Sequence, residues 1–89
     1  MEIKKQKKTE EELKNMGVFN WPTWSHEPAT FPWEYTEDET CYILEGKATI
    51  KPENGDPVEI EKGDFVTFPK GMKCTWTIHE GIKKHYSFG

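Results

Sequence analysis

Four side chains in this sequence could carry chemistry if the fold brought them together: Tyr35, Glu39, Cys74 and Lys84. Glu39 could act as a general acid or base, and Tyr35 as a hydrogen-bond donor or acid. Cys74 could act as a nucleophile if Lys84 lay near enough to favour its thiolate. A nearby Glu39 would oppose that thiolate, and packing as a small hydrophobic side chain is the competing interpretation for Cys74. The sequence therefore predicts a polar cluster with these four residues as the catalytic candidates.

Further side chains at related positions could form the walls of a small-molecule site. The predicted ligand-binding residues are Trp33, Cys41, Trp76 and Tyr86. In this hypothesis the aromatic rings frame a small ligand, while Glu39 and Lys84 hold its polar ends. The alternative is structural: the rings fill a narrow interior, and the cysteines pack as small hydrophobic groups.

Side chains alternate between the two faces of a strand, so sequence parity predicts which of them meet. In the last expected strand the apolar side chains share a face with Lys84, and in the strand before it Cys74 shares a face with Trp76. A buried Glu39 and a buried Lys84 would be costly unless they paired, so their placement on inward faces indicates a site. The alternative is that Glu39 ends its strand in water and that the long Lys84 side chain reaches the rim.

Strands separated by turns occupy most of the sequence from residue 39 onward. The dipeptide formed by Asn54 and Gly55 is a strong hairpin signal. Further turns are expected at Gly46, at residues 69–71 and at residues 79–81, each ending one strand and starting another. Short strands that recur about every 8–12 residues are typical of a sandwich or a barrel.

The N-terminal part predicts one short helix followed by interrupted extended segments. Thr9 and Glu12 have the spacing of a capping box, and Gly17 could end the helix. Three prolines in the aromatic-rich segment that follows favour short extended pieces. The lysines before the helix predict a solvated arm. The expected organisation is an arm with a short helix at residues 1–17 and a β-barrel at residues 18–89.

Composition excludes several classes of function. The chain has 89 residues and a net charge of −4, without the positive face that nucleic-acid binding requires. No apolar run is long enough for a membrane-spanning helix, and nothing resembles a signal peptide. Two cysteines without metal-type spacing fit a reducing compartment. We therefore expect a cytoplasmic protein that binds neither nucleic acid nor membrane.

Two spacings in the sequence resemble the motifs of the cupins. The first cupin motif is G-x5-H-x-H-x3,4-E-x6-G, and here Glu39 is followed by Gly46 at the matching distance. The second motif is G-x5-P-x-G-x2-H-x3-N, and here Gly63, Pro69, Gly71 and Cys74 have its spacing. The resemblance implies an all-β fold: a single conical antiparallel β-barrel of the jelly-roll type, with one short N-terminal α-helix and a site in the barrel mouth.

The amino-acid sequence around these motifs is similar to that of one subgroup of the family. The stretches FPWEYTEDETCYILEG, GDFVTFPKGMKCTW and KKHYSFG resemble small single-domain cupins related to the ureidoglycine aminohydrolase cupin domain. The three histidine positions of the usual metal centre, however, fall at Trp33, Tyr35 and Cys74. Only Glu39 remains of the four usual ligands. The chain's own histidines lie off the motif and are expected on the surface.

The sequence therefore predicts a small cupin that binds or converts a small polar metabolite in the barrel mouth without the standard metal centre. The resemblance implies a nitrogen-containing, ureide-like compound. We expect no cofactor. One alternative is a metal-dependent enzyme in which Glu39 and Cys74, with Tyr35, hold a divalent metal. The other is a non-catalytic binding module. An apolar outer face with Tyr42 and Leu44 suggests a homodimer.

Overall fold

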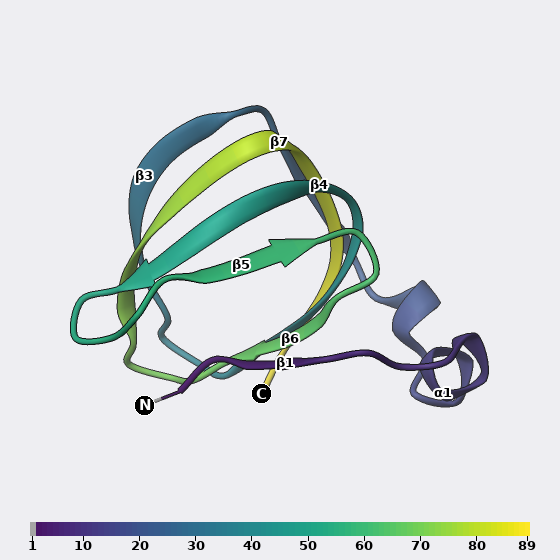
Figure 1. Cartoon of the computed structure of the whole chain (residues 1–89). Coiled ribbons are helices and arrows are strands. Elements are labelled where there is room, and N and C mark those ends of the chain that lie inside the picture. The colour runs from purple at the N-terminus through teal and green to yellow at the C-terminus, as the bar shows by residue number, and fades with distance from the viewer. Residues whose placement is uncertain (1) are drawn as a thin grey trace.

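The computed structural model describes residues 2–89, and most of these residues lie in antiparallel strands that curl into a barrel around a common interior (Figure 1). The elements in chain order are β1 (Lys4–Gln6), α1 (Glu10–Asn15), the 3-10 helix η1 (Val18–Asn20), β2 (Thr23–His26), β3 (Ala29–Glu34), β4 (Glu39–Pro52), β5 (Val58–Glu61), β6 (Phe65–Phe68) and β7 (Lys73–Phe88). The expected all-β fold with one short N-terminal helix is confirmed.

Two long strands, β4 and β7, form the spine of the sheet by pairing with each other along most of their lengths. The other edge of β4 pairs with β6 and then with β5, whereas the other edge of β7 pairs with β3 and then with β2. The hairpin expected at Asn54 and Gly55 is confirmed, because it joins β4 to β5. Strand β1 completes the sheet at the outer edge of β6.

The predicted turns at Gly46 and at residues 79–81 were wrong, because strands β4 and β7 continue through these positions without ending. Gly46 has φ = 97° and lies against the backbone of Gly81 on the neighbouring strand. The register of the two strands also shifts there, between Ile43 and Ala48. A glycine at a bulge lets two long strands bend together without ending.

This bulge changes which positions of β4 face inward. Before it the buried side chains include Glu39, Cys41 and Ile43, and after it they are Ala48 and Ile50. Strand β7 keeps one parity over its whole length, so Cys74, Trp76 and Ile78 share the inner side with Ile82 and Lys84. Inward placement of these β7 residues is therefore confirmed.

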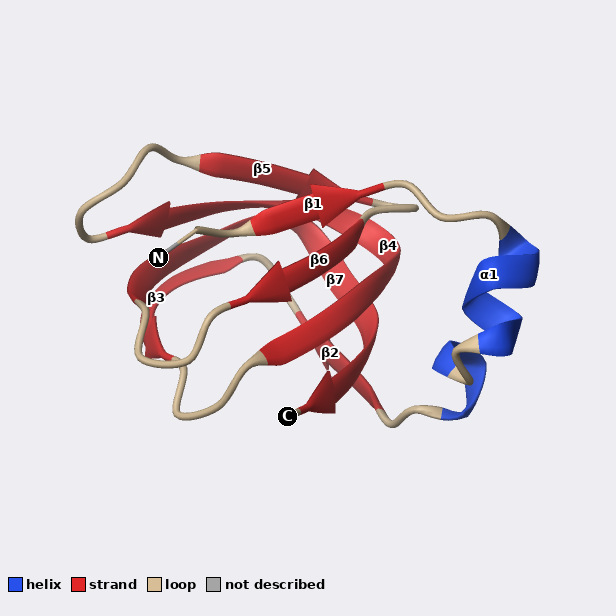
Figure 2. Cartoon of the chain, turned by 90° about the horizontal axis from the view of Figure 1, so that it is seen from below, coloured by secondary structure: helices blue, strands red, loops and turns tan. Residues whose placement is uncertain are grey.

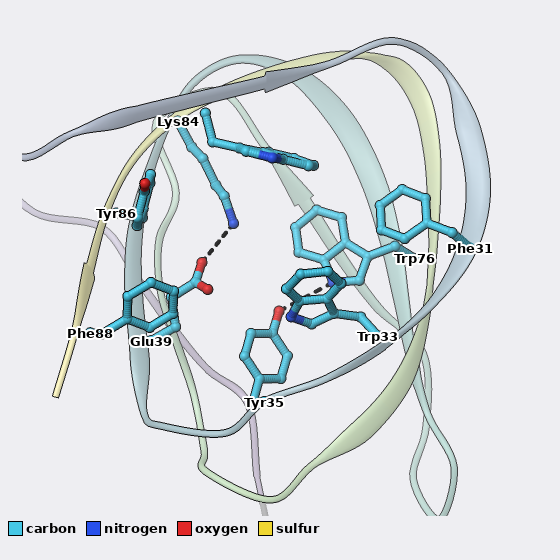
Figure 3. A pocket seen from close by; sticks show the side chains of 9 residues that line it. Phe31, Trp33, Tyr35, Glu39, Trp76, Lys84, Tyr86 and Phe88 are labelled. Carbon is cyan, nitrogen blue, oxygen red and sulfur yellow. Dashed lines mark hydrogen bonds and ion pairs between the residues drawn. The ribbon is translucent and has the colours of Figure 1, made fainter.

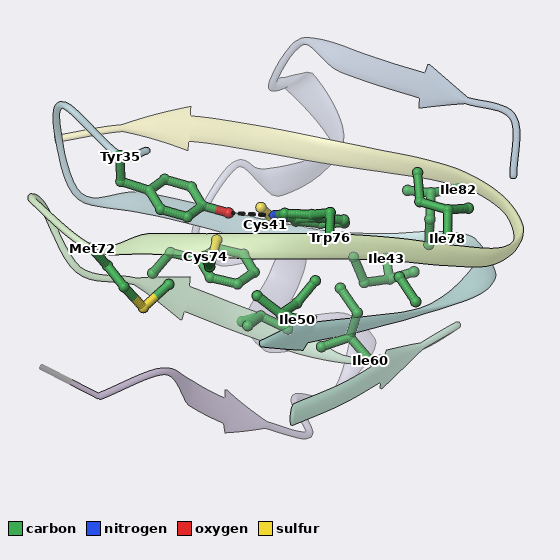
Figure 4. Close-up of a cluster of buried hydrophobic side chains, with 13 residues drawn as sticks. Tyr35, Cys41, Ile43, Ile50, Ile60, Met72, Cys74, Trp76, Ile78 and Ile82 are labelled. Carbon is green, nitrogen blue, oxygen red and sulfur yellow. Dashed lines mark hydrogen bonds between the residues drawn. The ribbon is translucent and has the colours of Figure 1, made fainter. Parts of the chain in front are cut away.

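The core is one large cluster inside the curled sheet (Figure 4). Its residues come from strands β4, β5, β6 and β7 and from the loops that carry Tyr35 and Met72. A smaller cluster of Leu13, Val18 and Phe65 lies between α1, η1 and β6, and the half-buried Trp21 and Tyr42 pack against it. Phe19 packs edge-to-face against the ring of Tyr42, with ring centroids 6.0 Å apart. The outer face that suggested a homodimer is thus partly covered by the chain itself, and the homodimer stays a prediction.

The side chains of β1 are exposed, as expected for a solvated arm, but its backbone is hydrogen-bonded to β6 (Figure 2). Lys7 then forms an ion pair with the buried Asp64, with a distance of 2.6 Å from Nζ to Oδ1. The capping box is confirmed: the amide of Glu12 donates to Thr9 Oγ1, and the amide of Thr9 donates to Glu12 Oε1. Gly17 follows the helix and its C-cap residue, and it has a left-handed φ of 75°.

Candidate functional site

A cavity of about 160 Å³ opens at one end of the curled sheet, where β3 and β7 end and β4 begins (Figure 3). Its lining is mostly aromatic: Trp24, Phe31, Trp33, Tyr35, Trp76, Tyr86 and Phe88. Two charged side chains, Glu39 and Lys84, complete the lining. Trp33 and Phe88 form the rim, since about half of each side chain's surface is exposed.

Glu39 and Lys84 form a buried ion pair in the wall of this cavity. Lys84 Nζ lies 2.6 Å from Glu39 Oε2, and the two residues are 6% and 4% exposed. Sequence parity thus placed the pair correctly, and the alternative of two separate, water-exposed groups was wrong. Each charge offsets part of the cost of burying the other.

Two indole rings also contact the ammonium group. Lys84 Nζ lies 5.0 Å from the ring centroids of both Trp24 and Trp76. Cation–π attraction of this kind strengthens when water is excluded. The cation is therefore held by one carboxylate and two aromatic faces.

Glu39 uses one oxygen for its protein contacts and leaves the other to the cavity. Oε2 accepts from Lys84 Nζ and, at 2.9 Å, from the thiol of Cys41. Within residues 2–89, Oε1 accepts no hydrogen bond, and no fully buried side-chain oxygen is without a partner. Oε1 is consequently open to the cavity, as Figure 3 shows.

Tyr35 supplies a hydroxyl group to the same cavity. Its oxygen accepts a hydrogen bond of 3.1 Å from Trp76 Nε1, and its ring stacks on Phe68 with centroids 4.9 Å apart. Burial, helped by the negative charge of Glu39, raises the pKa of the Tyr35 hydroxyl far above its usual value. The group therefore stays protonated and can donate a hydrogen bond into the cavity.

The two cysteines lie in different surroundings. Cys41 is fully buried and donates to Glu39; burial raises its pKa, although the nearby Lys84 charge acts in the opposite direction. Cys74 belongs to the hydrophobic core and is not among the residues that line the cavity. Burial raises the pKa of the Cys74 thiol to about 11. The structure thus places Cys41, and not Cys74, against the ion pair. The prediction that Cys41 contacts a ligand was wrong, because Cys41 lies behind Glu39 and is not among the residues that line the cavity.

Backbone hydrogen bonds fix the segments that carry these side chains. The amide of Tyr35 donates to the carbonyl of Met72, and the amide of Gly71 donates to the carbonyl of Tyr35, at 3.0 and 2.6 Å. Asp38, directly before Glu39, accepts from the amide of Lys70 through its side chain and from the amide of Gly89 through its carbonyl. The start of β4 and the end of β7 are tied together beside the ion pair.

Most of the predicted site residues meet at the cavity. Tyr35, Glu39 and Lys84 line it, together with the predicted aromatic residues Trp33, Trp76 and Tyr86. Trp24 was not predicted as a site residue; its strand β2 pairs with β7 so that Trp24 lies opposite Lys84. Parity within a four-residue strand predicts a face but not the strand's partner. The three histidines lie outside the lining.

The donor groups at this site do not fit a divalent metal ion. Among residues 2–89, no three His, Cys, Asp or Glu side chains are grouped closely enough to hold one. The carboxylate of Glu39 already faces the ammonium group of Lys84. The alternative that Glu39 and Cys74 are metal ligands therefore has no support from the geometry, because Cys74 lies in the core and not in the cavity lining.

Both a family model and a solved structure match nearly the whole chain. The model of the EutQ-like cupin domain family matches residues 13–86. A crystal structure of a DUF861 family protein from Thermotoga maritima is 49% identical, with a TM-score of 0.97 over 99% of this chain and 100% of that one. No curated protein matches the chain.

Less similar structures match about 72% of this chain. The Clostridium difficile EutQ protein is 25% identical with a TM-score of 0.65, over 72% of this chain and 50% of that one. A DUF861 family protein from Pseudomonas syringae is 26% identical with the same TM-score, over 72% of this chain and 28% of that one. Within residues 2–89, no helix is long and apolar enough to cross a membrane.

Proposed function

The chain belongs to the EutQ-like cupin domain family, and from that premise we propose that it binds a small polar metabolite in the aromatic cavity. The observation that carries the proposal is the buried Glu39–Lys84 pair in the cavity wall. A buried ion pair contributes little net stability compared with apolar residues of the same size. Its position beside an open, water-accessible cavity supports a role in recognition.

The polar groups of the cavity favour a ligand that offers an acceptor and a donor side by side. Lys84 Nζ and the Tyr35 hydroxyl donate, and Glu39 Oε1 accepts. An amide or ureide group presents a carbonyl oxygen next to an N–H group and could bind both charged side chains at once. This pattern, together with the resemblance to the ureidoglycine aminohydrolase cupin domain, supports a nitrogen-containing ureide as the finer assignment.

The size of the cavity limits the ligand. Its volume of about 160 Å³ lies below the roughly 300–1,000 Å³ of pockets that take drug-sized molecules. The flat indole and phenol rings favour a planar body. A small planar amide or ureide, without a long substituent, meets both conditions.

The pair could also do chemistry, because Glu39 Oε1 faces the ligand and could act as a general base. The two functions differ in one measurable respect. If the protein only binds its ligand, there is no turnover, and Glu39→Gln weakens the affinity. If it is an enzyme, Glu39→Gln abolishes turnover of a substrate that still binds.

Differential scanning calorimetry with a panel of small probes tests the proposal. N-methylurea, hydantoin and benzamide represent the expected class, and benzoate and benzylamine are the charged counterparts. A ligand at 100 times its Kd stabilises the folded state by about 2.7 kcal/mol, which for a domain of this size raises Tm by roughly 10 °C or more. We expect the neutral amides to raise Tm more than benzoate or benzylamine.

Two matched double variants complete the experiment. Glu39→Gln with Lys84→Met removes both buried charges together and so avoids an unpaired charge. Glu45→Gln with Lys83→Met changes a neighbouring pair in register on the exposed side of the same two strands. We expect the first variant to lose the response and the second to keep it. An equal response in both variants, or no response in the wild type, would contradict the proposed function.

A further inference from the structure

Lys84 is the one buried lysine among residues 2–89, although the sequence has twelve. Its Nζ lies 5.0 Å from the ring centroids of Trp24 and Trp76, and it points toward Glu39 in the cavity (Figure 3). A primary amine in an apolar pocket beside a proton acceptor is the arrangement that proteins use for imine formation with carbonyl compounds. The polar-ligand hypothesis above does not use this property of the amine.

We propose that Lys84 is a covalent capture site for a small aldehyde, which it binds as a protonated imine. The proposal shares the cavity with the proposed function but needs neither an amide ligand nor turnover. The co-reactant is an aldehyde with a compact, flat or apolar body, because aromatic side chains form most of the cavity wall.

The step begins with a proton transfer along the short hydrogen bond between Lys84 Nζ and Glu39 Oε2. Lys84 becomes a neutral amine and Glu39 a neutral acid. The nitrogen lone pair then forms a C–N bond to the aldehyde carbon, while the carbonyl π electrons move to oxygen. Transfer of one proton from nitrogen to that oxygen gives a neutral carbinolamine.

The second half of the step expels water. The Glu39 acid gives its proton to the carbinolamine hydroxyl, the C–O bond breaks, and the nitrogen lone pair forms the C=N bond. The products are one water molecule, the Lys84 iminium ion and the Glu39 carboxylate. Charge and proton count equal those of the starting ion pair with a neutral aldehyde, and nothing is oxidised or reduced.

The surroundings of Lys84 favour this reaction in three ways. Glu39 Oε2 lies 2.6 Å from Lys84 Nζ and can take its proton directly, and the two neutral groups that result are less costly to bury than unpaired charges. The iminium ion keeps a cation beside Glu39 and near the two indole rings. The Tyr35 hydroxyl lines the same cavity and can donate a hydrogen bond to the carbinolamine oxygen.

The cysteines do not compete for the aldehyde. Cys41 is fully buried and its thiol donates to Glu39, so it is a positioning residue for the carboxylate. Cys74 is not part of the cavity lining. Lys84 is consequently the only nucleophilic amine or thiol that lines the cavity within residues 2–89.

Reductive trapping tests the proposal on the wild-type chain. The protein is mixed with benzaldehyde below its own concentration and with cyanoborohydride, and peptide mass spectrometry locates the resulting secondary amines. The exposed Lys83 is the internal control in the same peptide region. We expect trapping at Lys84 to exceed that at Lys83 by at least about tenfold, since Lys84 alone has a proton acceptor in an apolar cavity.

Two variants separate the role of Lys84 as the nucleophile from the role of Glu39 in proton transfer. Lys84→Arg keeps a cation beside Glu39 but cannot form the imine, and we expect it to abolish the fast-trapped fraction. Glu39→Gln should slow trapping at Lys84 and leave Lys83 unchanged, with circular dichroism used to check that the variant is folded. Trapping at Lys84 no faster than at Lys83 in the wild type overturns the proposal.

The outcome is distinguishable from that of the proposed function. Amide probes that raise Tm without any preferential adduct at Lys84 would overturn the aldehyde proposal alone. A preferential adduct at Lys84 without any response to the amide probes would support it while contradicting the proposed function.

Discussion

The residues around Glu39 supply its carboxylate with a positive partner and a hydrogen-bond donor, although none of them is a histidine. The positions that carry histidine in the cupin motif hold Trp33, Tyr35 and Cys74 in this chain. The positive charge comes instead from Lys84, on the last strand. Cys41 and the two indole rings complete the contacts around the ion pair.

Thiol reactivity should follow burial. The raised pKa of Cys74, about 11, means that less thiolate is present at any pH below that value than for an ordinary thiol with a pKa of about 8.5. We expect Cys74 in the Cys41→Ser variant to react slowly with iodoacetamide at pH 8, and faster as the pH rises towards 11.

Alkylation rates between pH 7 and 11, measured by mass spectrometry on folded and urea-unfolded protein, check this expectation. In the reciprocal Cys74→Ser variant, we expect Cys41 to react more slowly still, because it is fully buried and hydrogen-bonded. A folded Cys74 that reacts as fast as the unfolded thiol at pH 8 would refute the expectation and restore its candidacy as a nucleophile.

Parity explains which site residues the sequence could predict. Alternation placed Lys84, Trp76 and Cys74 on one face of β7, and all three are buried. It could not predict the depth of each along the barrel, which depends on strand tilt and register. Lys84 and Trp76 therefore reach the cavity, whereas Cys74 on the same face packs in the core.

At the scale of elements, the shared bend of β4 and β7 determines where the site residues fall. The bulge near Gly46 reverses the parity of β4, so that both halves of the strand contribute to the interior. The sequence predicted strand ends at these glycines because glycine is commonest in turns. A bulge and a turn give the same local signal, and only the pairing partner tells them apart.

Replacement of the two glycines at the bend should have unequal effects. A Cβ on Gly46 would collide with the carbonyl oxygens of Gly81 and Glu80, at a residue whose φ is 97°. We expect Gly46→Ala to lower the free energy of unfolding by roughly 2–5 kcal/mol, from strain and overpacking together.

Gly81→Ala is the matched control, because its Cβ would meet only the carbonyl oxygen of His26, at an ordinary 3.6 Å. We expect a change of less than about 1 kcal/mol for it. Urea unfolding of both variants provides the measurement. Similar losses for the two alanines would show that the close approach at Gly46 is not what fixes the bend.

At the scale of the whole molecule, β6 connects the two hydrophobic clusters. Phe65 packs with α1 and η1, while Val66 and Phe68 belong to the main core. The cupin fold itself could be predicted, because Glu39 with Gly46, and Gly63 with Pro69 and Gly71, have the spacings of the two cupin motifs. The edge strand β1 could not, since three exposed polar residues have no hydrophobic pattern; long-range pairing with β6 and the Lys7–Asp64 ion pair determine it.

Hydrogen exchange should rank the strands by their position in the sheet. Residues 48–50 of β4 pair with β5 on one side and with β7 on the other, whereas β1 pairs on one side only. We expect amides at 48–50 to exchange more slowly than those of β1 by roughly 100-fold or more, because edge strands open locally. Exchange followed by NMR checks this, and equal protection of the two regions would contradict the sheet order.

Three of the four tryptophans, Trp24, Trp33 and Trp76, line the cavity, and only Trp21 packs elsewhere. Intrinsic fluorescence of the native chain is consequently weighted towards this one location. Occupancy of the cavity changes the polarity and quenching around those three indoles, so the protein carries its own optical reporter for titrations and needs no attached dye.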